Sequence, residues 1–475
     1  MARVLRISRQ EVLKRTQISG LHLMSEAVSV IQNELVTAFP PFASIDEFIK
    51  LFIDILVKDY KLNSILVDKQ IAQQVIDEIR ERRITSGTGN ELVVKNVVKS
   101  EDNVKKTYLK HLSLLRQHLE KHPIFQSREF TLSPIDNLIT LDKDLEVECI
   151  VYGFLYKDKT KIDSEFYIED NTGKVPIVFS EDTQFKDDLI PSNSFVLVEG
   201  SYDSAKDTLF ADSVGHTSPA NLQENIDLSN SLERVGRMVV VVSDIHLDDK
   251  QTLDKLKTML TGYDSMVPIP DLFIFVGPFV SQTCQDITIF KNHMKNLVKL
   301  IAKFNKISRL SQFIFVPGFH DNEGNDLPKP AFTVDMFPTS TTKLANYHLA
   351  TNPVNIYIDN RHICLAAFPY MSRLEQNIIN DNCDDTQQLG SSIIKLISSN
   401  GHLSSGLSRH YESCLSVFHI PDFIILFDSD MNEAMDSKAY DYSHLLVLPS
   451  FSSQQFKFKV FYTEPKHHDS SQILS

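Results

Sequence analysis

The pattern of apolar and polar positions predicts helices in the first part of the chain. Between Phe48 and Leu56, apolar side chains recur every three or four residues, which is the spacing of one buried helix face. S-x-x-E capping boxes at residues 8–11 and 44–47 mark two helix starts, and a third helix is expected from Asp68. Residues 1–80 are therefore predicted to form a small helical domain.

The pattern changes after residue 80. Residues 81–130 are polar and charged, apart from a periodic stretch at Tyr108–Leu119 that predicts one helix, and we interpret them as a connector that is partly mobile. Residues 131–220 carry short alternating runs of strand type, separated by turn sequences such as Asp170–Gly173. About five short strands predict a small β-barrel, and the segments FYIEDNTGKVPIVF and FVLVEGSY are typical of an OB-fold.

In residues 235–475 the pattern becomes that of an α/β domain. Helical spacing occurs at Leu253–Leu260 and Thr288–Phe304. Apolar runs of this region predict buried strands that end in polar loops, which is the usual place for a site. These runs are Met238–Val242, Leu272–Val276, Phe313–Val316, Ile363–Ala367, Phe423–Phe427, Leu445–Leu448 and Phe456–Phe461. The predicted fold class is therefore multidomain α + β, with a helical domain, a barrel and an α/β sandwich in that order.

The composition restricts the partners that the chain can bind. Of the 475 residues, 42% are hydrophobic and 23% are charged, and the formal net charge is −14. A protein that holds duplex DNA by itself needs a basic face, so this charge favours a protein partner. No stretch approaches the roughly 20 apolar residues of a membrane span, and the first residues lack the apolar run of a signal peptide. The five cysteines lack a CxxC pair, which fits buried thiols in a reducing compartment.

Aromatic residues of the predicted barrel allow two interpretations. Tyr152, Tyr156, Phe166 and Tyr167 could stack on the bases of a single strand, as aromatics do on the basic face of such barrels. Few basic residues accompany them, however, and aromatics in a barrel of this size are more often part of the core. We therefore expect a core role.

The loops after the predicted strands of residues 235–475 carry the strongest chemical signal. The first loop, in VVVVSDIHLDD, contains Asp244 and His246, although Asp244 could equally cap the following helix. The third, FVPGFHDNEG, contains Phe319, His320 and Asp321. Its Gly-Phe-His-Asp resembles the GNHD loop of calcineurin-like metallophosphoesterases, and the second loop, IFVGPF, lies where that superfamily has a strand followed by GD.

The resemblance to these enzymes fails at the metal ligands. Two metals about 4 Å apart must clamp the attacking and leaving oxygens, and the aspartate that bridges them is replaced here by Pro278. Phe319 replaces the asparagine ligand, and Asp428 and Asp430 stand where the histidines of G-H-x-H would be. Asp244, His246, His320, Asp321 and His402 remain. We expect no catalytic residue, no cofactor and no bound metal, so that these residues form a vestigial site; a single weakly held metal is the alternative.

The order of the three domains resembles that of the B subunits of eukaryotic replicative DNA polymerases, and most closely the second-subunit family of DNA polymerase epsilon. The barrel segments quoted above carry this resemblance, together with VVVVSDIHLDD, LDKLKTMLTGY, FVPGFHD, LPKPAF, ATNPVNIYI, SNGHLSSG, PDFIIL, LLVLPSF and FKFKVFY. The B subunits of polymerases alpha and delta share the barrel and phosphoesterase halves. The short helical domain is similar to the N-terminus of the epsilon family, which looks like the lid of an AAA+ ATPase.

The resemblance implies a function and a set of partners. It implies a nuclear, non-catalytic accessory subunit whose barrel (131–220) and inactive phosphoesterase-like domain (235–475) hold the C-terminal zinc-binding domain of the catalytic subunit. It also implies that residues 1–80 contact the replicative helicase through the GINS complex, and that DNA is reached mainly through the complex. The alternatives are a B subunit of polymerase delta or alpha, an active metal-dependent phosphodiesterase, and a single-strand-binding module.

Overall fold

A computed structural model gives the arrangement of most of the chain, which divides into two compact units, residues 1–91 and 92–475. It describes residues 22–23, 28, 66–67, 92–97, 104–121, 123–126, 130–158, 165–219, 236–265, 268–281, 287–321, 327–333, 336, 344, 346–358, 361–407, 415–417, 419–440, 443–453, 455–463 and 468–472. The helical domain predicted for residues 1–80 lies almost wholly outside these residues. Within it, β1 (His22–Leu23) and β2 (Leu66–Val67) are described and pair in parallel.

Residues 146–215 form the closed barrel that the alternating runs predict. Its strands are β4 (Glu146–Lys157), β5 (Phe166–Glu169), β6 (Lys174–Phe185), β8 (Ser194–Asp203) and β9 (Thr208–Gly215). They pair in the order β4-β5-β6-β9-β8, with β6 parallel to β9 and the other pairs antiparallel. Side chains alternate along β4, so that Val151 and Leu155 point into the barrel core. The short helix α7 (Ile135–Ile139) adds Ile135 and Leu138 to that core.

The rest of the described chain forms a sandwich of two six-stranded sheets. The first has the order β13-β12-β11-β10-β20-β21 and the second β18-β19-β17-β15-β14-β3. The strands of the first sheet are β10 (Met238–Ser243), β11 (Leu272–Val276), β12 (Gln312–Val316), β13 (Tyr347–Leu349), β20 (Lys457–Tyr462) and β21 (His468–Gln472). Those of the second are β3 (Val93–Asn96), β14 (Val354–Ile358), β15 (Arg361–Ala367), β17 (Phe423–Phe427), β18 (Met435–Ala439) and β19 (Ser443–Leu448).

Three apolar layers hold the sandwich together. The inner faces of the sheets meet through side chains such as Val241, Ile274 and Ile425. The outer face of the first sheet packs against α9 (Lys250–Ser265), α10 (Ile287–Ile301) and α11 (Asn305–Leu310). That of the second sheet packs against α12 (Tyr370–Glu375) and α13 (Thr386–Asn400). All seven predicted strand runs lie in these sheets, because strands buried on both faces are continuously apolar and easily recognised.

The predicted connector 81–130 contains more structure than its polar sequence indicates. Its residues 93–96 form β3, which pairs antiparallel with β14 at the edge of the second sheet. Beside this strand, the Asn96 Oδ1 atom accepts from the Thr351 backbone N–H at 3.0 Å. The helix predicted at 108–119 is confirmed as α5 (Val104–Glu120), which is followed by α6 (Pro123–Gln126).

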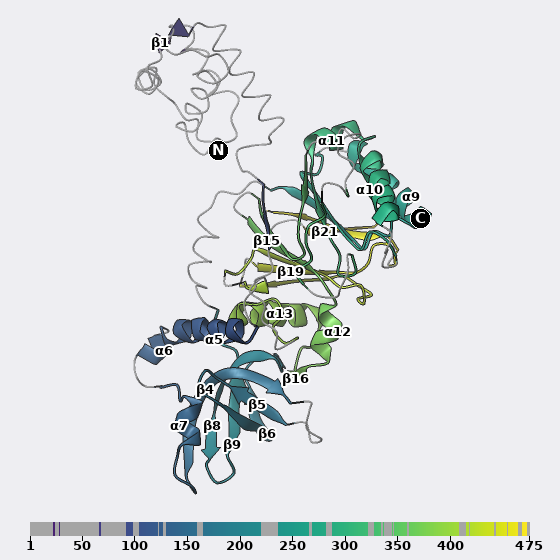
Figure 1. Ribbon diagram of the computed structural model, residues 1–475. Coiled ribbons are helices and arrows are strands. Elements are labelled where there is room, and N and C mark those ends of the chain that lie inside the picture. The colour runs from purple at the N-terminus through teal and green to yellow at the C-terminus, as the bar shows by residue number, and fades with distance from the viewer. Residues whose placement is uncertain are drawn as a thin grey trace. The chain divides into compact units, whose positions relative to one another are not determined.

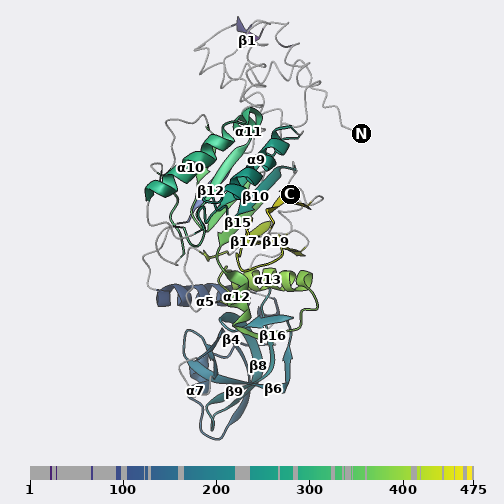
Figure 2. The ribbon, with the colours of Figure 1, turned by 90° about the vertical axis from the view of Figure 1, so that its right-hand side faces the viewer.

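The barrel and the sandwich are joined within the second unit. The short strand β7 (Leu189–Pro191), which precedes β8, pairs antiparallel with β16 (Ile378–Asp381), which follows α12. Helices α5 and α13 lie between the barrel strands and the sheets (Figures 1 and 2). In the described part of the chain, no helix has the length and apolar character to cross a membrane.

Candidate functional site

The loops that follow β10, β11, β12 and β17 carry the residues that the sequence singles out. The strands β10, β11 and β12 are parallel neighbours, so their carboxyl ends share one edge of the sheet. Asp244 follows β10, Pro278 follows β11, residues 319–321 follow β12, and Asp428 follows β17. We call the four acids Asp244, Asp321, Asp428 and Asp430 the strand-end cluster.

Asp244 lies at the centre of the strand-end cluster. Its side chain is only 7% exposed, and its backbone has the left-handed conformation, with φ 50°. Burial raises the pKa of its carboxyl to about 7; a hydrogen bond with Ser450 opposes this shift, and the negative charges of Asp321, Asp428 and Asp430 add to it. The structure therefore brings four carboxyls into electrostatic contact.

Asp321 ties the second and third loops together. One carboxyl oxygen accepts from the Gly318 backbone N–H at 2.9 Å and the other from the Phe279 N–H at 3.1 Å. A Cβ atom on Gly277 would lie 1.7 Å from the Asp321 Oδ2 atom, so this loop needs glycine. Burial raises the pKa of Asp321 to about 6, although both N–H groups and the charge of Lys329 oppose the shift.

Asp428 has a structural role at the start of α12. Its buried carboxyl accepts from the Met371 N–H at 2.7 Å and from the Asp430 N–H at 3.0 Å. Such bonds satisfy backbone donors that the first turn of a helix leaves free. Burial is the main cause that raises the pKa of Asp428. Asp430 is exposed and accepts from the Ser372 hydroxyl at 3.3 Å.

The two replaced ligand positions are filled by apolar groups. Phe319 is buried and belongs to the apolar cluster that joins α12 and α13 to the second sheet. The Arg373 guanidinium carbon lies 5.2 Å and the Lys329 ammonium 5.7 Å from the centre of its ring, distances at which a ring attracts a cation. Pro278 is half-buried and offers no carboxylate.

The three histidines of the predicted vestigial site do not join the acids in a metal-binding arrangement. His320 is exposed, with its ring edge-on to that of Phe319. His246 is half-buried, and burial lowers its pKa although Asp248 and Asp249 oppose this. Among the described residues, no three His, Cys, Asp or Glu side chains are placed to hold an ion. The residues present therefore do not fit the two-metal site that the resemblance implies.

His402 lies in a different part of the molecule from the position the sequence analysis assigned to it. It is fully buried just beyond the C-terminus of α13, where its Nδ1 atom lies 2.8 Å from the Ser404 hydroxyl. Its ring packs edge-on against His111 of α5, with the ring centres 5.5 Å apart. Sequence order alone suggested a ligand; tertiary packing places His402 at the junction with the barrel.

Sequence reasoning missed Lys329, a buried cation beside the strand-end cluster. Its side chain is 1% exposed, and its charge acts on Asp321. A signal was present, because this lysine stands between two prolines in the otherwise apolar segment LPKPAF. A lysine is almost never fully buried without a compensating group.

The aromatic face of the barrel is covered, as the core interpretation predicts. Tyr152, Tyr156 and Tyr167 are buried, and they pack with Leu112 and Leu115 of α5. Phe166, the fourth aromatic, is half-buried and lies edge-on to Phe179. A strand of nucleic acid would have to displace α5 to stack on the three tyrosines.

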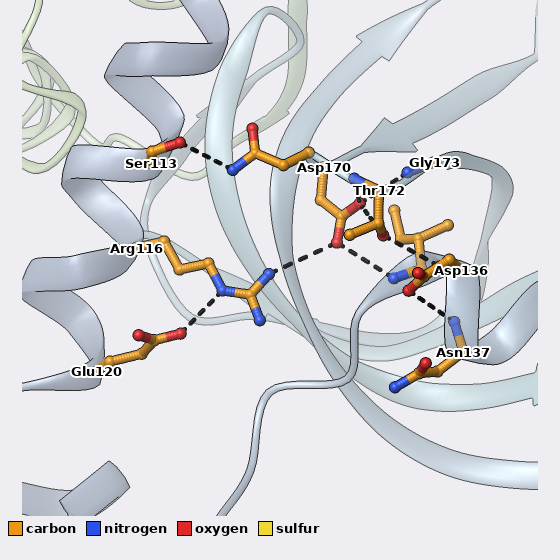
Figure 3. Close-up of polar contacts among 10 residues, drawn as sticks. Ser113, Arg116, Glu120, Asp136, Asn137, Asp170, Thr172 and Gly173 are labelled. Carbon is orange, nitrogen blue, oxygen red and sulfur yellow. Dashed lines mark hydrogen bonds and ion pairs between the residues drawn. The ribbon is translucent and has the colours of Figure 1, made fainter.

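A polar network fixes α5 on this face (Figure 3). Asp170, at the turn between β5 and β6, accepts from the Thr172 and Gly173 N–H groups through Oδ1 and from the Ile135 N–H through Oδ2. Arg116 of α5 reaches the same carboxylate at 3.7 Å. The DNTG turn predicted from sequence thus also connects α5 and α7 to the barrel.

Comparison with known proteins agrees with this architecture. A model of the B subunit of DNA polymerases alpha and epsilon matches residues 239–432, and a model of the OB-fold domain of DNA polymerase epsilon subunit 2-like proteins matches residues 101–218. DNA polymerase epsilon subunit 2 of Mus musculus is 26% identical over 77% of this chain and 75% of its own length. That of Homo sapiens is 26% identical over 74% and 70%, and that of Drosophila melanogaster 24% over 73% and 69%.

The chain belongs to the DNA polymerase epsilon subunit 2 family. The match at 101–218 covers α5, α7 and the whole barrel, which confirms the OB-fold. The match at 239–432 contains all four acids of the strand-end cluster, together with Pro278, Phe319 and Lys329. In this member of the epsilon subunit 2 family, both matched regions therefore include the parts whose geometry is described above.

Proposed function

We propose that this chain is the non-catalytic accessory (B) subunit of a nuclear DNA polymerase epsilon complex, in which it holds the catalytic subunit and joins it to the replicative helicase. Relatives named DNA polymerase epsilon subunit 2 match about three quarters of the chain, which supports this subunit type over those of polymerases alpha and delta. The partners follow from the family and not from any contact in the structure.

One observation carries the non-catalytic part of the proposal. The positions of the bridging aspartate and of the asparagine ligand hold Pro278 and Phe319, and the ring of Phe319 is packed into an apolar cluster. A two-metal mechanism needs a carboxylate that offsets the charge of both ions. We therefore interpret the sandwich as a phosphoesterase-like domain that has lost its reaction, with the function in its surfaces.

The division of the chain supports two separate partners. The barrel and sandwich belong to one unit, 92–475, in which β7 and β16 pair directly. We propose that this unit holds the C-terminal zinc-binding domain of the catalytic subunit. Residues 1–91 form the other unit, and we propose that the helical domain 1–80 within it binds the GINS complex of the helicase. DNA is then reached mainly through the complex.

Co-purification tests the assignment to a polymerase. The full chain is co-expressed with a polymerase epsilon catalytic subunit and, as a matched control, with the same subunit lacking its C-terminal zinc-binding domain. We expect a stable complex with the first and none with the second. A well-folded chain that binds neither subunit, or that binds both equally, would contradict the proposal.

Removal of residues 1–80 tests the helicase connection. The truncated chain should lose GINS but still bind the catalytic subunit, since the two units are separate. Retention of GINS by the truncated chain would place that contact elsewhere.

A phosphodiesterase assay addresses the enzyme alternative. Cleavage of a generic diester by the full chain with Mn²⁺ should not exceed the buffer rate. Manganese-dependent cleavage that disappears in the variant carrying both His320→Ala and Asp244→Ala would show that the chain is an enzyme.

A further inference from the structure

Lys329 is held rigidly beside the strand-end cluster. Its backbone N–H donates to the Asn352 carbonyl at 2.7 Å, and its own carbonyl accepts from the Asn352 N–H at 3.1 Å. The Asn352 side chain in turn bonds the backbone of Ala367 through both of its polar atoms, at 2.8 and 2.9 Å. Lys329 is thus clamped to the end of β15, and its side chain does not reach solvent.

The surroundings of the Lys329 ammonium are apolar on one side and acidic on the other. The ring of Phe319 lies on the first side. On the second lies Asp321, whose side chain is 4% exposed and whose pKa is lowered by the lysine charge against the effect of burial. Asp244 is the neighbour of Asp321 within the cluster. Burial of either charge alone is costly, so each lowers the cost of the other.

We propose that the Lys329 ammonium takes the place of a divalent cation as the counter-charge of the strand-end cluster, and that the cluster is closed to metals for this reason. An ammonium is a compact point charge with three donors. It can neutralise one carboxylate without the ligands that Pro278 and Phe319 no longer supply. A second cation at the same place would be repelled by the lysine. This proposal goes beyond the accessory function and does not depend on the identity of the partners.

A double-mutant cycle on the isolated full chain tests the coupling. Lys329→Met leaves the Asp321 carboxylate without its counter-charge, and Asp321→Asn leaves the ammonium without its own. Each single change should lower the midpoint of thermal unfolding by roughly 5–10 °C. The double variant should lose clearly less than the sum of the two, because no unpaired charge remains. Additive losses, or a neutral Lys329→Met, would overturn the proposal.

Folding failure of a single variant leaves the test decisive. If Lys329→Met gives no folded protein, the double variant with Asp321→Asn should restore folding. A double variant that also fails to fold would count against the proposal, because removal of both charges should relieve the defect.

Lys459 provides a matched control. It is another buried lysine of the sandwich, and it pairs with Asp436 at 2.6 Å. The combination of Lys459→Met with Asp321→Asn should be additive, since these residues belong to different pairs. Equal coupling of Asp321 to both lysines would show that the effect is not specific to Lys329.

Manganese titration tests the exclusion of metals. Mn²⁺ alone is added to the wild-type full chain, and binding is followed by its electron paramagnetic resonance signal. We expect no saturable site that disappears in Asp321→Asn. A site in the wild type that is lost in this variant would show that the cluster accepts a divalent cation beside Lys329.

Discussion

The strand-end cluster and the junction between barrel and sandwich respond in opposite ways to the same physical cause. In the cluster, burial raises the pKa of the Asp244 and Asp321 carboxyls to about 7 and 6. At the junction, burial lowers the pKa of His111 to about 4 and also lowers that of His216. Burial disfavours the charged form in each case, so acids stay protonated and histidines stay neutral. Acidification therefore favours the fold of one region and opposes that of the other.

The two regions also differ in how they are held together. The cluster depends on close approach of backbone, because Gly277 and Gly318 leave no room for a side chain. The junction depends on side-chain hydrogen bonds around Asn400. Its Oδ1 atom accepts from the Phe195 N–H of β8 at 2.6 Å, and its carbonyl lies 2.6 Å from the His111 Nε2 atom of α5. One residue at the end of α13 thus connects three elements.

The largest effect is expected where backbone meets backbone. In Gly318→Ala the new Cβ atom would lie 2.1 Å from the Gly277 carbonyl carbon, so the two loops must move apart. We expect the free energy of unfolding to fall by about 3 kcal/mol or more, measured by chemical denaturation.

Gly262→Ala is the control for this change. It adds the same methyl group in helix α9, where nothing lies within 4 Å of the new atom. The alanine should stabilise the helix by about 0.5–1 kcal/mol. Similar losses in both variants would contradict the distinction between a tight loop and an open helix position.

The second largest effect is expected at the junction. Asn400→Ala removes the acceptor of the buried Phe195 N–H, and we expect a loss of about 2 kcal/mol in the free energy of unfolding. Hydrogen exchange should accelerate in β8 and α5 but not in β10–β12. Asn380→Ala is the control, because its half-buried amide only donates at 3.2–3.3 Å to the Asp187 and Asp188 carbonyls. A larger loss for Asn380→Ala would contradict the central place of Asn400.

The opposite pH responses can be separated by two substitutions. Because the pKa of Asp244 rises on folding from 3.8 to about 7, its contribution is complete below pH 3.8 and is lost as the pH rises to 7. Because that of His111 falls from 6.5 to about 4, its contribution is complete above pH 6.5 and is lost as the pH falls to 4. Between pH 8 and pH 5, Asp244→Asn should therefore lose about 1–2 kcal/mol more than the wild type, and His111→Gln less than the wild type by a similar amount.

Denaturation at several pH values across this range measures both responses. Equal pH profiles in the wild type and the two variants would show that neither group titrates with folding, and the contrast between the two regions would then fail.

The smallest effect is expected at the surface of the junction. Arg116→Ala removes an ion pair of 3.7 Å to Asp170, and partly exposed pairs contribute under about 1 kcal/mol. Thermal unfolding should change little, whereas Asp170→Ala should cost more because three backbone donors lose their acceptor. Equal losses would mean that the ion pair, and not the turn, fixes α5.

Much of the fold could be predicted from local pattern, because period and turn chemistry are local properties. The barrel, α5 and the seven strand runs of the sandwich follow from alternation, helical spacing and apolar continuity. The loss of ligands at Pro278 and Phe319 was equally visible, since a side chain without a carboxylate or amide cannot replace one that has it. Strand β3 could not be predicted, because its polar edge sequence gains its pairing only from β14.

The sequence by itself determined which chemical groups the strand-end loops contain, and therefore that a two-metal site cannot be complete. Only the tertiary structure decided where the remaining groups lie: His402 against His111, the barrel tyrosines beneath α5, and Lys329 beside Asp321. The physical reason is that these contacts join residues far apart in the chain. Their energies depend on burial and on the distance between charges, which no local pattern contains.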